Sequence, residues 1–297
     1  MKKQRYNFQP LIYLLPTLIV LGFWLIKPLF QNLIYMFSSW NMLPGTEPTF
    51  VSWGNFERLF NNPNFQTAMK NTVYYILMMI PFAIIIPIFI AAVTQNLIPR
   101  ASRIIRFFIV LPIIIPPVAS STVYRWLFHP TNGIVNHVLV NIGILDQGLR
   151  FLSSPDYAKP LLAIITGLRM VGYCTLIFLA GISGINKTCY EAATLDGAGK
   201  FRQFKDITLP LLSPTIVFVF MLCILFANQW SFIFIDVLTE GGPFGQTTNL
   251  FYLMYEYAFK QANVGIASAS SVFYLLIFGF IAYLLTKLRN RLAFYDN

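Results

Sequence analysis

The residues best suited to bind a solute are polar side chains inside long apolar segments. In residues 161–185, Thr166, Arg169 and Tyr173 are spaced i, i+3 and i+7, which places them on one face of a helix. A later apolar segment contains Asn228, Trp230 and Ser231, and Asp236 follows directly after its end. An aromatic ring beside hydrogen-bonding groups suits a hydroxyl-rich ligand. The C–H faces of such a ligand stack on the ring, and its hydroxyls form hydrogen bonds with amides and charged groups.

Composition places these segments in a membrane. Hydrophobic residues make up 57% of the chain, charged residues 11%, and mean hydropathy is +0.64, whereas typical soluble domains have roughly 45–50% and 25%. Six segments have the length of about 20 apolar residues that a bilayer core requires. They are residues 11–37, 71–94, 107–128, 161–185, 214–235 and 265–288. We therefore predict an all-α integral membrane protein with six transmembrane helices.

Two interpretations of the polar residues in these spans remain open. A polar residue inside a bilayer is costly, which makes it a functional candidate by default. The candidates for a substrate pathway are Arg169, Tyr173, Asn228, Trp230 and Ser231. In the structural alternative, Arg169 pairs with a carboxylate or with carbonyls only to hold the bundle together, and Tyr173 only packs.

A polar stretch at residues 187–213 separates the fourth and fifth spans. Thr188 precedes Glu191 by three residues, the spacing of a capping box, and Gly197 is placed to end the helix that follows. Apolar residues then recur at helical spacing from Phe201, and Pro210 is expected to break this second helix. The stretch thus predicts a helix–glycine turn–helix hairpin that stands out of the membrane.

Basic residues are distributed unevenly between the two sides of the predicted spans. Thirteen lie on one side and five on the other. The thirteen are Lys2, Lys3, Arg5, Arg100, Arg103, Arg106, Lys187, Lys200, Arg202, Lys205, Lys287, Arg289 and Arg291. Since cytoplasmic loops carry the excess of Lys and Arg, both termini and the hairpin are predicted to be cytoplasmic. The net charge of +10 is then a signal of topology and does not indicate a nucleic-acid partner.

No catalytic, metal or nucleotide site is predicted in this chain. The cysteines have neither paired nor metal-ligand spacing, and the histidines lie in an outside loop without ligand spacing. Gly197 to Lys200 is similar to a phosphate-binding loop, but the first glycine of that motif would fall at Thr194. Phe201 also occupies the place of the hydroxyl that binds magnesium.

The hairpin sequence E-A-A-T-L-D-G-A, followed by I-T-L-P, resembles the EAA loop of permease subunits in binding-protein-dependent ABC importers. The matching residues are Glu191, Ala192, Ala193, Asp196, Gly197, Ala198, Ile207, Leu209 and Pro210. The runs LPIIIPP at 111–117 and GIASASS at 265–271 resemble the carbohydrate-uptake branch of this family, which includes maltose, glycerol-3-phosphate and oligosaccharide permeases. The resemblance covers nearly the whole chain.

The resemblance implies a type I ABC importer permease fold, with one transmembrane domain over residues 1–297 and a coupling hairpin at about 187–213. It implies that the matched hairpin residues dock on a separate ATPase subunit. ATP and Mg would be bound by two such subunits, so this chain would hold no cofactor and would not be an enzyme. A second homologous permease and an extracytoplasmic binding protein would complete the importer in a bacterial or archaeal cell membrane. The solute implied is a sugar, an oligosaccharide or a glycerol phosphate, moved by alternating access.

Three alternatives compete with this interpretation. An ion-gradient-driven secondary transporter would be expected to have buried carboxylates for ion coupling, and no Asp or Glu lies in the middle of a predicted span. An amphipathic hairpin on the bilayer surface would explain the polar stretch without a docking partner. A membrane assembly subunit without transport would not need the polar face in the fourth span.

Overall fold

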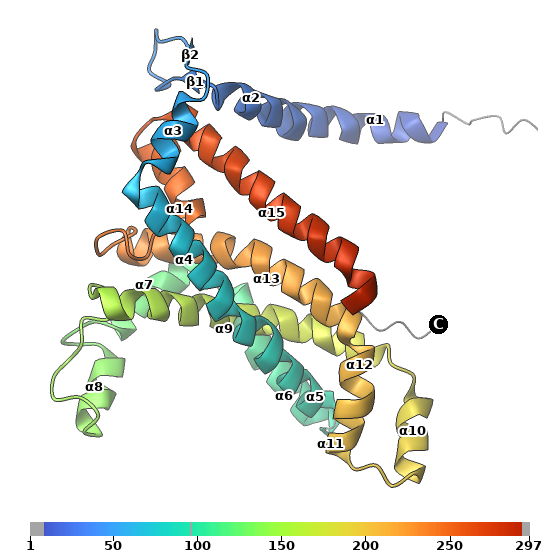
Figure 1. The fold of residues 1–297 in the computed structure, drawn as a ribbon. Helices are drawn as coiled ribbons and strands as arrows, with labels where there is room; N and C mark the ends of the chain where they lie inside the picture. The colour runs from blue at the N-terminus through green and yellow to red at the C-terminus, as the bar shows by residue number, and fades with distance from the viewer. Residues whose placement is uncertain (1–8, 96, 293–297) are drawn as a thin grey trace, which may run out of the picture. The chain divides into compact units, whose positions relative to one another are not determined.

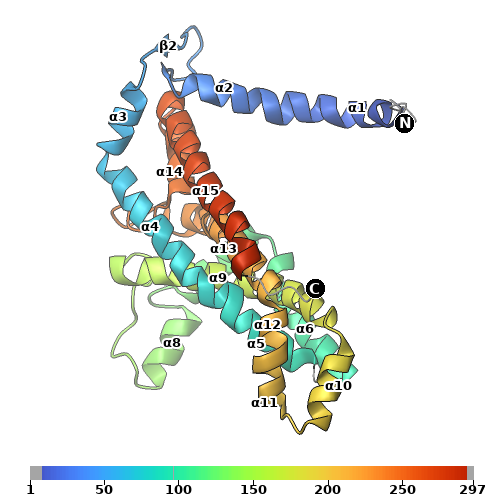
Figure 2. The same ribbon diagram turned by 45° about the vertical axis from the view of Figure 1, so that its right-hand side comes forward.

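The computed structural model describes residues 9–95 and 97–292, and the side chains of residues 13–95 and 97–287. The described chain is mostly helical (Figures 1 and 2). Its two short strands, β1 (Ser38–Ser39) and β2 (Thr49–Phe50), pair antiparallel. The predicted all-α membrane class is confirmed. Of the basic residues used for orientation, Lys2, Lys3 and Arg5 lie outside the described residues, as do the side chains of Arg289 and Arg291.

Five predicted spans are helices long and apolar enough to cross a membrane. The first joins α1 (Gln9–Leu21), a π-helical turn (Gly22–Ile26) and α2 (Lys27–Tyr35). The second joins α4 (Pro63–Ile80), a π-helical turn (Pro81–Ile85) and α5 (Ile86–Gln95). The other three are α9 (Pro155–Ser183), α13 (Ser213–Phe234) with a π-helical turn (Ile235–Thr239), and α15 (Val264–Leu292).

The third predicted span, residues 107–128, is not a single straight helix. It forms α6 (Pro99–Ile114) and α7 (Pro117–Leu127), which meet at an angle of 97°. Pro116 and Pro117 have no N–H to donate to the carbonyls one turn earlier, so the α-helical ladder cannot continue through them. These prolines belong to the run LPIIIPP at 111–117, whose spacing alone does not give the size of the bend.

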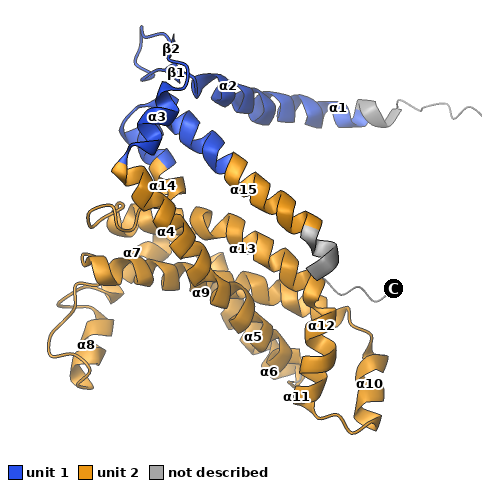
Figure 3. Cartoon of the chain, viewed as in Figure 1, with its two compact units in different colours: residues 1–62, 254–275 blue, residues 63–253, 276–297 orange. Residues whose placement is uncertain are grey.

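The chain's contacts divide it into two compact units, residues 1–62 with 254–275 and residues 63–253 with 276–297 (Figure 3). Helices α14 (Leu250–Tyr255) and α15 each continue across the boundary between them. The prediction of one domain over residues 1–297 stays a prediction.

The smaller unit is held together by backbone hydrogen bonds that a few side chains complete. The Asn55 amide, in α3 (Gly54–Phe60), donates to the carbonyls of Met36 and Ser38, both at 2.9 Å. The Asn32 amide donates to the Ser271 hydroxyl at 2.6 Å. This unit also contains the π-helical turn Glu256–Lys260 that follows α14.

Helix α9 is the centre of the larger unit and the most buried of the five candidate spans. It packs against α4, α5, α6 and α13. Two of its glycines allow close approach, since a Cβ at Gly167 would meet the Phe82 ring and one at Gly172 would overlap the Ile109 carbonyl oxygen. The outer segments of this unit include α8 (Ile134–Asn141). The close packing fixes the depth and rotation of the α9 side chains named by the sequence.

Candidate functional site

An aromatic cluster from α9 and α13 lies beside the central arginine of α9. The Tyr173 ring lies 5.5 Å from Trp230 and 6.1 Å from Phe226, both in edge-to-face geometry. Phe226 and Trp230 stack with their centroids 5.4 Å apart and their planes 10° apart. The Arg169 guanidinium carbon lies 5.7 Å from the centroid of Trp230. The structure thus brings together three of the five predicted pathway residues, Arg169, Tyr173 and Trp230.

All four side chains of this cluster are only partly buried. A cation beside aromatic rings at mid-helix depth can bind a ligand that presents both C–H faces and polar groups. Phe226 was not singled out in the sequence, although its i, i+4 spacing to Trp230 could have indicated a shared face.

The Arg169 side chain also has a structural contact. Its Nη2 donates to the carbonyl of Ile113 at 3.3 Å. In an unbroken helix that carbonyl would accept from the N–H of residue 117, but Pro117 has none. The structural interpretation of Arg169, pairing with carbonyls to hold the bundle, is therefore correct for one of its donors. Its Nε is buried and has no hydrogen-bond partner within the described chain.

Asn228 and Ser231 occupy a different environment from the aromatic cluster. Both are fully buried, with no exposed surface. The Asn249 amide donates to the Asn228 carbonyl at 3.0 Å and to the Ser231 hydroxyl at 2.9 Å. These contacts tie α13 to the segment just before α14. Ser231 thus has a packing role here, while the Asn228 amide group has no partner among the described residues.

Thr166 was expected to share the face of Arg169 and Tyr173. It is fully buried, and its hydroxyl donates to the Leu162 carbonyl of its own helix at 2.8 Å. It therefore presents no free polar group at the cluster. Asp236 lies half-buried in the π-helical turn that ends the fifth span.

The predicted hairpin is present, and its two arms lie side by side (Figures 1 and 2). Its first arm is α10 (Lys187–Leu195). The capping residue is Asn186, whose side-chain oxygen accepts from the Thr188 N–H at 3.0 Å. The capping box between Thr188 and Glu191 was wrong, because Asn186 begins the helix two residues earlier and Thr188 is already helical.

The end of α10 matches its prediction. Gly197 has φ +73°, the left-handed conformation that glycine adopts without strain. The Ala198 N–H donates to the Ala193 carbonyl at 2.8 Å and the Gly197 N–H to Thr194 at 3.1 Å. These two bonds form a Schellman motif, which satisfies the last carbonyls of the helix.

The second arm comprises α11 (Lys200–Gln203), a π-helical turn (Phe204–Thr208) and α12 (Leu209–Leu211). This arm ends at Leu211, one residue after Pro210, and a turn at Leu212 separates it from α13, so the break lies between Pro210 and Pro214. The π-helical turn precedes this proline and shifts the hydrogen-bonding register. The arms are joined by Gln203, which donates to the Thr194 hydroxyl at 2.9 Å, and by Tyr190 and Thr208, whose hydroxyls are 2.9 Å apart.

The residues expected to contact an ATPase subunit differ in their exposure. Glu191, Ala192, Asp196 and Gly197 are exposed, whereas Ala193, Ala198, Leu209 and Pro210 are half-buried. Beside the exposed group, Leu195 is 90% and Phe201 80% exposed. Two large apolar side chains at the tip of a polar hairpin indicate a surface that another molecule covers.

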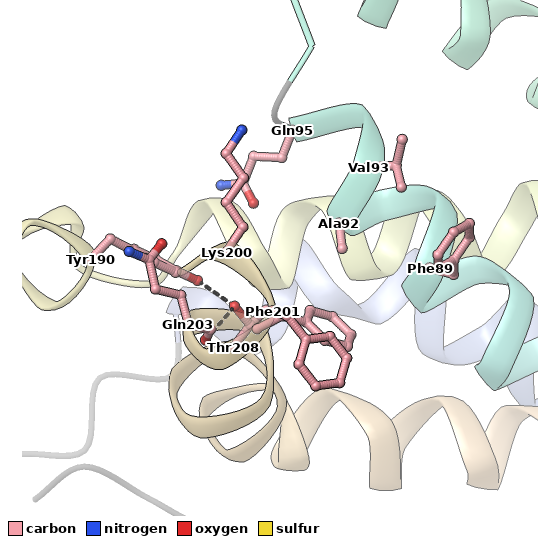
Figure 4. A pocket seen from close by; sticks show the side chains of 10 residues that line it. Phe89, Ala92, Val93, Gln95, Tyr190, Lys200, Phe201, Gln203 and Thr208 are labelled. Carbon is pink, nitrogen blue, oxygen red and sulfur yellow. Dashed lines mark hydrogen bonds between the residues drawn. The ribbon is translucent and has the colours of Figure 1, made fainter. Parts of the chain in front are cut away.

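A cavity of about 580 Å³ lies beside the second arm (Figure 4). Phe89, Ala92 and Val93 of α5 line one wall, and Phe201 and Phe204 line another. Lys200 and Gln95 lie at its polar end. The hairpin is therefore not packed tightly against α5, and its exposed tip is held by its own hydrogen bonds.

Comparison with known proteins gives one family. The family described as "Binding-protein-dependent transport system inner membrane component" matches residues 61–293. The sn-glycerol-3-phosphate transport system permease protein UgpA of Pectobacterium atrosepticum is 31% identical over 274 residues, covering 92% of this chain and 91% of that protein. The lactose transport system permease protein LacF of Rhizobium radiobacter is 29% identical, covering 87% and 86%.

Among solved structures, a chain of a bacterial ABC transporter involved in import of the acidic polysaccharide alginate has the same fold. The TM-score is 0.84 at 24% identity, and 95% of each chain is covered. The match extends the agreement in fold over nearly the whole chain, including segments before residue 61.

Proposed function

Because this chain belongs to the family of binding-protein-dependent transport system inner membrane components, we propose that it is the permease subunit of an ATP-driven importer for a carbohydrate-type solute. The observation that carries this proposal is the α9–α13 cluster, where Arg169, Tyr173 and Trp230 form a partly exposed polar and aromatic face in the membrane-spanning part of the chain. The face would line the solute's path during alternating access.

The exposed tip of the hairpin supports coupling to a separate ATPase. Leu195 and Phe201 project from a turn closed by Gly197, and nothing in the described chain covers them. In the proposed assembly the matched hairpin residues dock on an ATPase subunit, and closure of an ATPase pair moves the helices. ATP and Mg would be bound by those subunits. A second permease and an extracytoplasmic binding protein would complete the importer.

The relatives leave the charge of the solute open. One is named for glycerol 3-phosphate, which is anionic, and another for lactose, which is neutral. The proposed function therefore specifies a carbohydrate-type solute and does not specify whether this solute is charged.

The proposed orientation places the hairpin in the cytoplasm. We expect a single cysteine at Gln246, exposed in the loop after the fifth span, to be labelled by an impermeant thiol reagent from outside intact cells. A cysteine at the exposed Lys200 should be labelled only after the membrane is opened. Both variants are made in a background without Cys174, Cys189 and Cys223. The reverse labelling pattern would refute the orientation.

The solute path is tested by Tyr173→Ala in the complete transporter, reconstituted in liposomes with its binding protein. We expect uptake to fall about tenfold, since the ring contacts of Tyr173 are worth roughly one kcal/mol or more. ATPase activity without solute should persist, because the hairpin is unchanged. Tyr173→Phe is the matched control, as it keeps the ring beside Trp230 and removes only the hydroxyl.

A packing role for Tyr173 predicts a different result from a pathway role. Tyr173→Ala would then assemble poorly and accumulate at a low level, while the complex that remains would transport normally per molecule. That result would remove Tyr173 from the pathway.

A further inference from the structure

Arg169 carries a charge that the described chain does not neutralise. Within residues 13–95 and 97–287, Arg169 has no carboxylate partner. Among the described residues, its single hydrogen bond goes to the Ile113 carbonyl, and its buried Nε–H has no acceptor. A cation in the middle of a spanning helix is costly to keep without a partner.

The hydrogen bond to Ile113 does not account for the charge. A carbonyl freed by Pro117 needs one N–H donor, and the neutral amide of Gln or Asn would provide it without a cation in the membrane. The hydrogen bond to Ile113 therefore occupies only one donor of the guanidinium. The other donors and the positive charge are not needed for this bond. A buried donor left without a partner lowers stability, which points to a partner outside the described chain.

The unused part of the guanidinium lies beside the aromatic rings. Trp230 is 5.7 Å from the guanidinium carbon, and Tyr173 contacts the same ring. The arrangement offers C–H stacking next to a planar fork of N–H donors, and such a fork matches the geometry of carboxylate and phosphate oxygens.

From this juxtaposition we infer that the transported solute is anionic, a phosphorylated polyol or a saccharide containing uronic acid, and that Arg169 pairs with its phosphate or carboxylate group. The inference rests on the proposed function and narrows its solute class. The relatives do not decide the point, since their names include both charged and neutral solutes. Arg169 is then the residue that determines selectivity for charge.

The first experiment measures uptake and stimulated ATPase activity of the complete wild-type transporter with its binding protein. The charged probes are glycerol 3-phosphate and digalacturonate, and the neutral probes are lactose and maltose. We expect stimulation by a charged probe and none by the neutral ones. Stimulation by neutral probes alone would overturn the inference and leave the importer function standing. Absence of any ATP-dependent uptake would contradict the proposed function as well.

The second experiment uses Arg169→Gln, which retains a donor for Ile113 and removes the charge. We expect uptake of the charged probe to fall about tenfold or more, the effect of losing a charged hydrogen bond. Assembly should be retained, because the Gln amide can still donate to the Ile113 carbonyl. Arg169→Lys should restore part of the uptake. Lys159→Gln is the matched control on α9, because Lys159 already has partners in Asn71, at 3.2 Å, and the Tyr74 ring.

Two results would refute the role of Arg169. If Arg169→Gln transports the charged probe as the wild type does, the guanidinium does not recognise it. If Arg169→Gln fails to assemble and Arg169→Lys assembles, the charge pairs with a partner subunit instead of with the solute.

Discussion

Gly197→Asp should abolish uptake while the protein still reaches the membrane in normal amount. Gly197 closes α10 in the left-handed conformation, with φ +73°. That conformation costs most residues roughly 1–2 kcal/mol, but Asp and Asn adopt it more readily than others. No atom of the described chain lies within 4 Å of the place that a Cβ would take at this position. The chain itself thus has room for the side chain, and the expected loss comes from the surface that covers the hairpin.

Two further variants distinguish blocked docking from the effects of an added charge and of backbone strain at Gly197. Gly197→Asn keeps a side chain that tolerates this conformation and adds no charge near the negative end of the α10 dipole. It should also lower uptake strongly if bulk at the turn blocks docking. Gly199→Asp is the control, because Gly199 has φ −66° at the start of α11, where Asp is a favourable cap.

The measurements are uptake and ATPase activity of the purified complex, together with the amount of ATPase subunit that copurifies. Normal uptake by Gly197→Asp would show that the turn does not face a docking surface. Equal losses in Gly197→Asp and Gly199→Asp would mean that any added carboxylate on the hairpin is harmful, and the specific role of Gly197 would be lost.

Gly172→Ala should destabilise the larger unit and disturb the solute path together. A Cβ at Gly172 would overlap the Ile109 carbonyl oxygen of α6 and lie 3.1 Å from Ile113 Cδ1. Since a helix carbonyl cannot rotate away as a side chain can, α6 and α9 must separate. Overpacking of this kind costs typically about 1–3 kcal/mol. The separation would also lengthen the 3.3 Å hydrogen bond from Arg169 to Ile113.

The test is the thermal stability of the detergent-purified protein and its level in the membrane. Gly279→Ala is the matched control, because this glycine also lies in a spanning helix and no described atom is within 4 Å of its added Cβ. We expect Gly172→Ala to lower the melting temperature and the protein level, and Gly279→Ala to change neither. Equal stability of the two variants would show that α6 and α9 do not approach as closely as the Gly172 contact requires.

The membrane class, the positions of five spans and the family were all available from the sequence. A stretch of about 20 apolar residues has few alternatives to a spanning helix, because the bilayer requires every backbone group to be bonded within the segment. The turn at Gly197 was predictable for a similar local reason, since a glycine after a short helix commonly takes the left-handed C′ position. Orientation and the ATPase contact remain predictions, because they concern the membrane and other subunits.

Features that depend on distant residues required the tertiary structure. The run LPIIIPP at 111–117 contains the prolines of the third span, but the 97° angle between α6 and α7 is visible only in the structure. It named Asn228 and Ser231 as pathway residues, yet a segment 18 to 21 residues further along the chain buries them through Asn249.

Arg169 shows most clearly which features follow from the sequence and which require the tertiary structure. Its type and depth were visible in the sequence, and both interpretations of it were open. Only the structure showed that one donor satisfies the carbonyl freed by Pro117 and that Nε has no partner in the part of the chain that is described. Spacing along one helix determines which residues share a face, whereas the neighbours of that face are set by how separate helices pack.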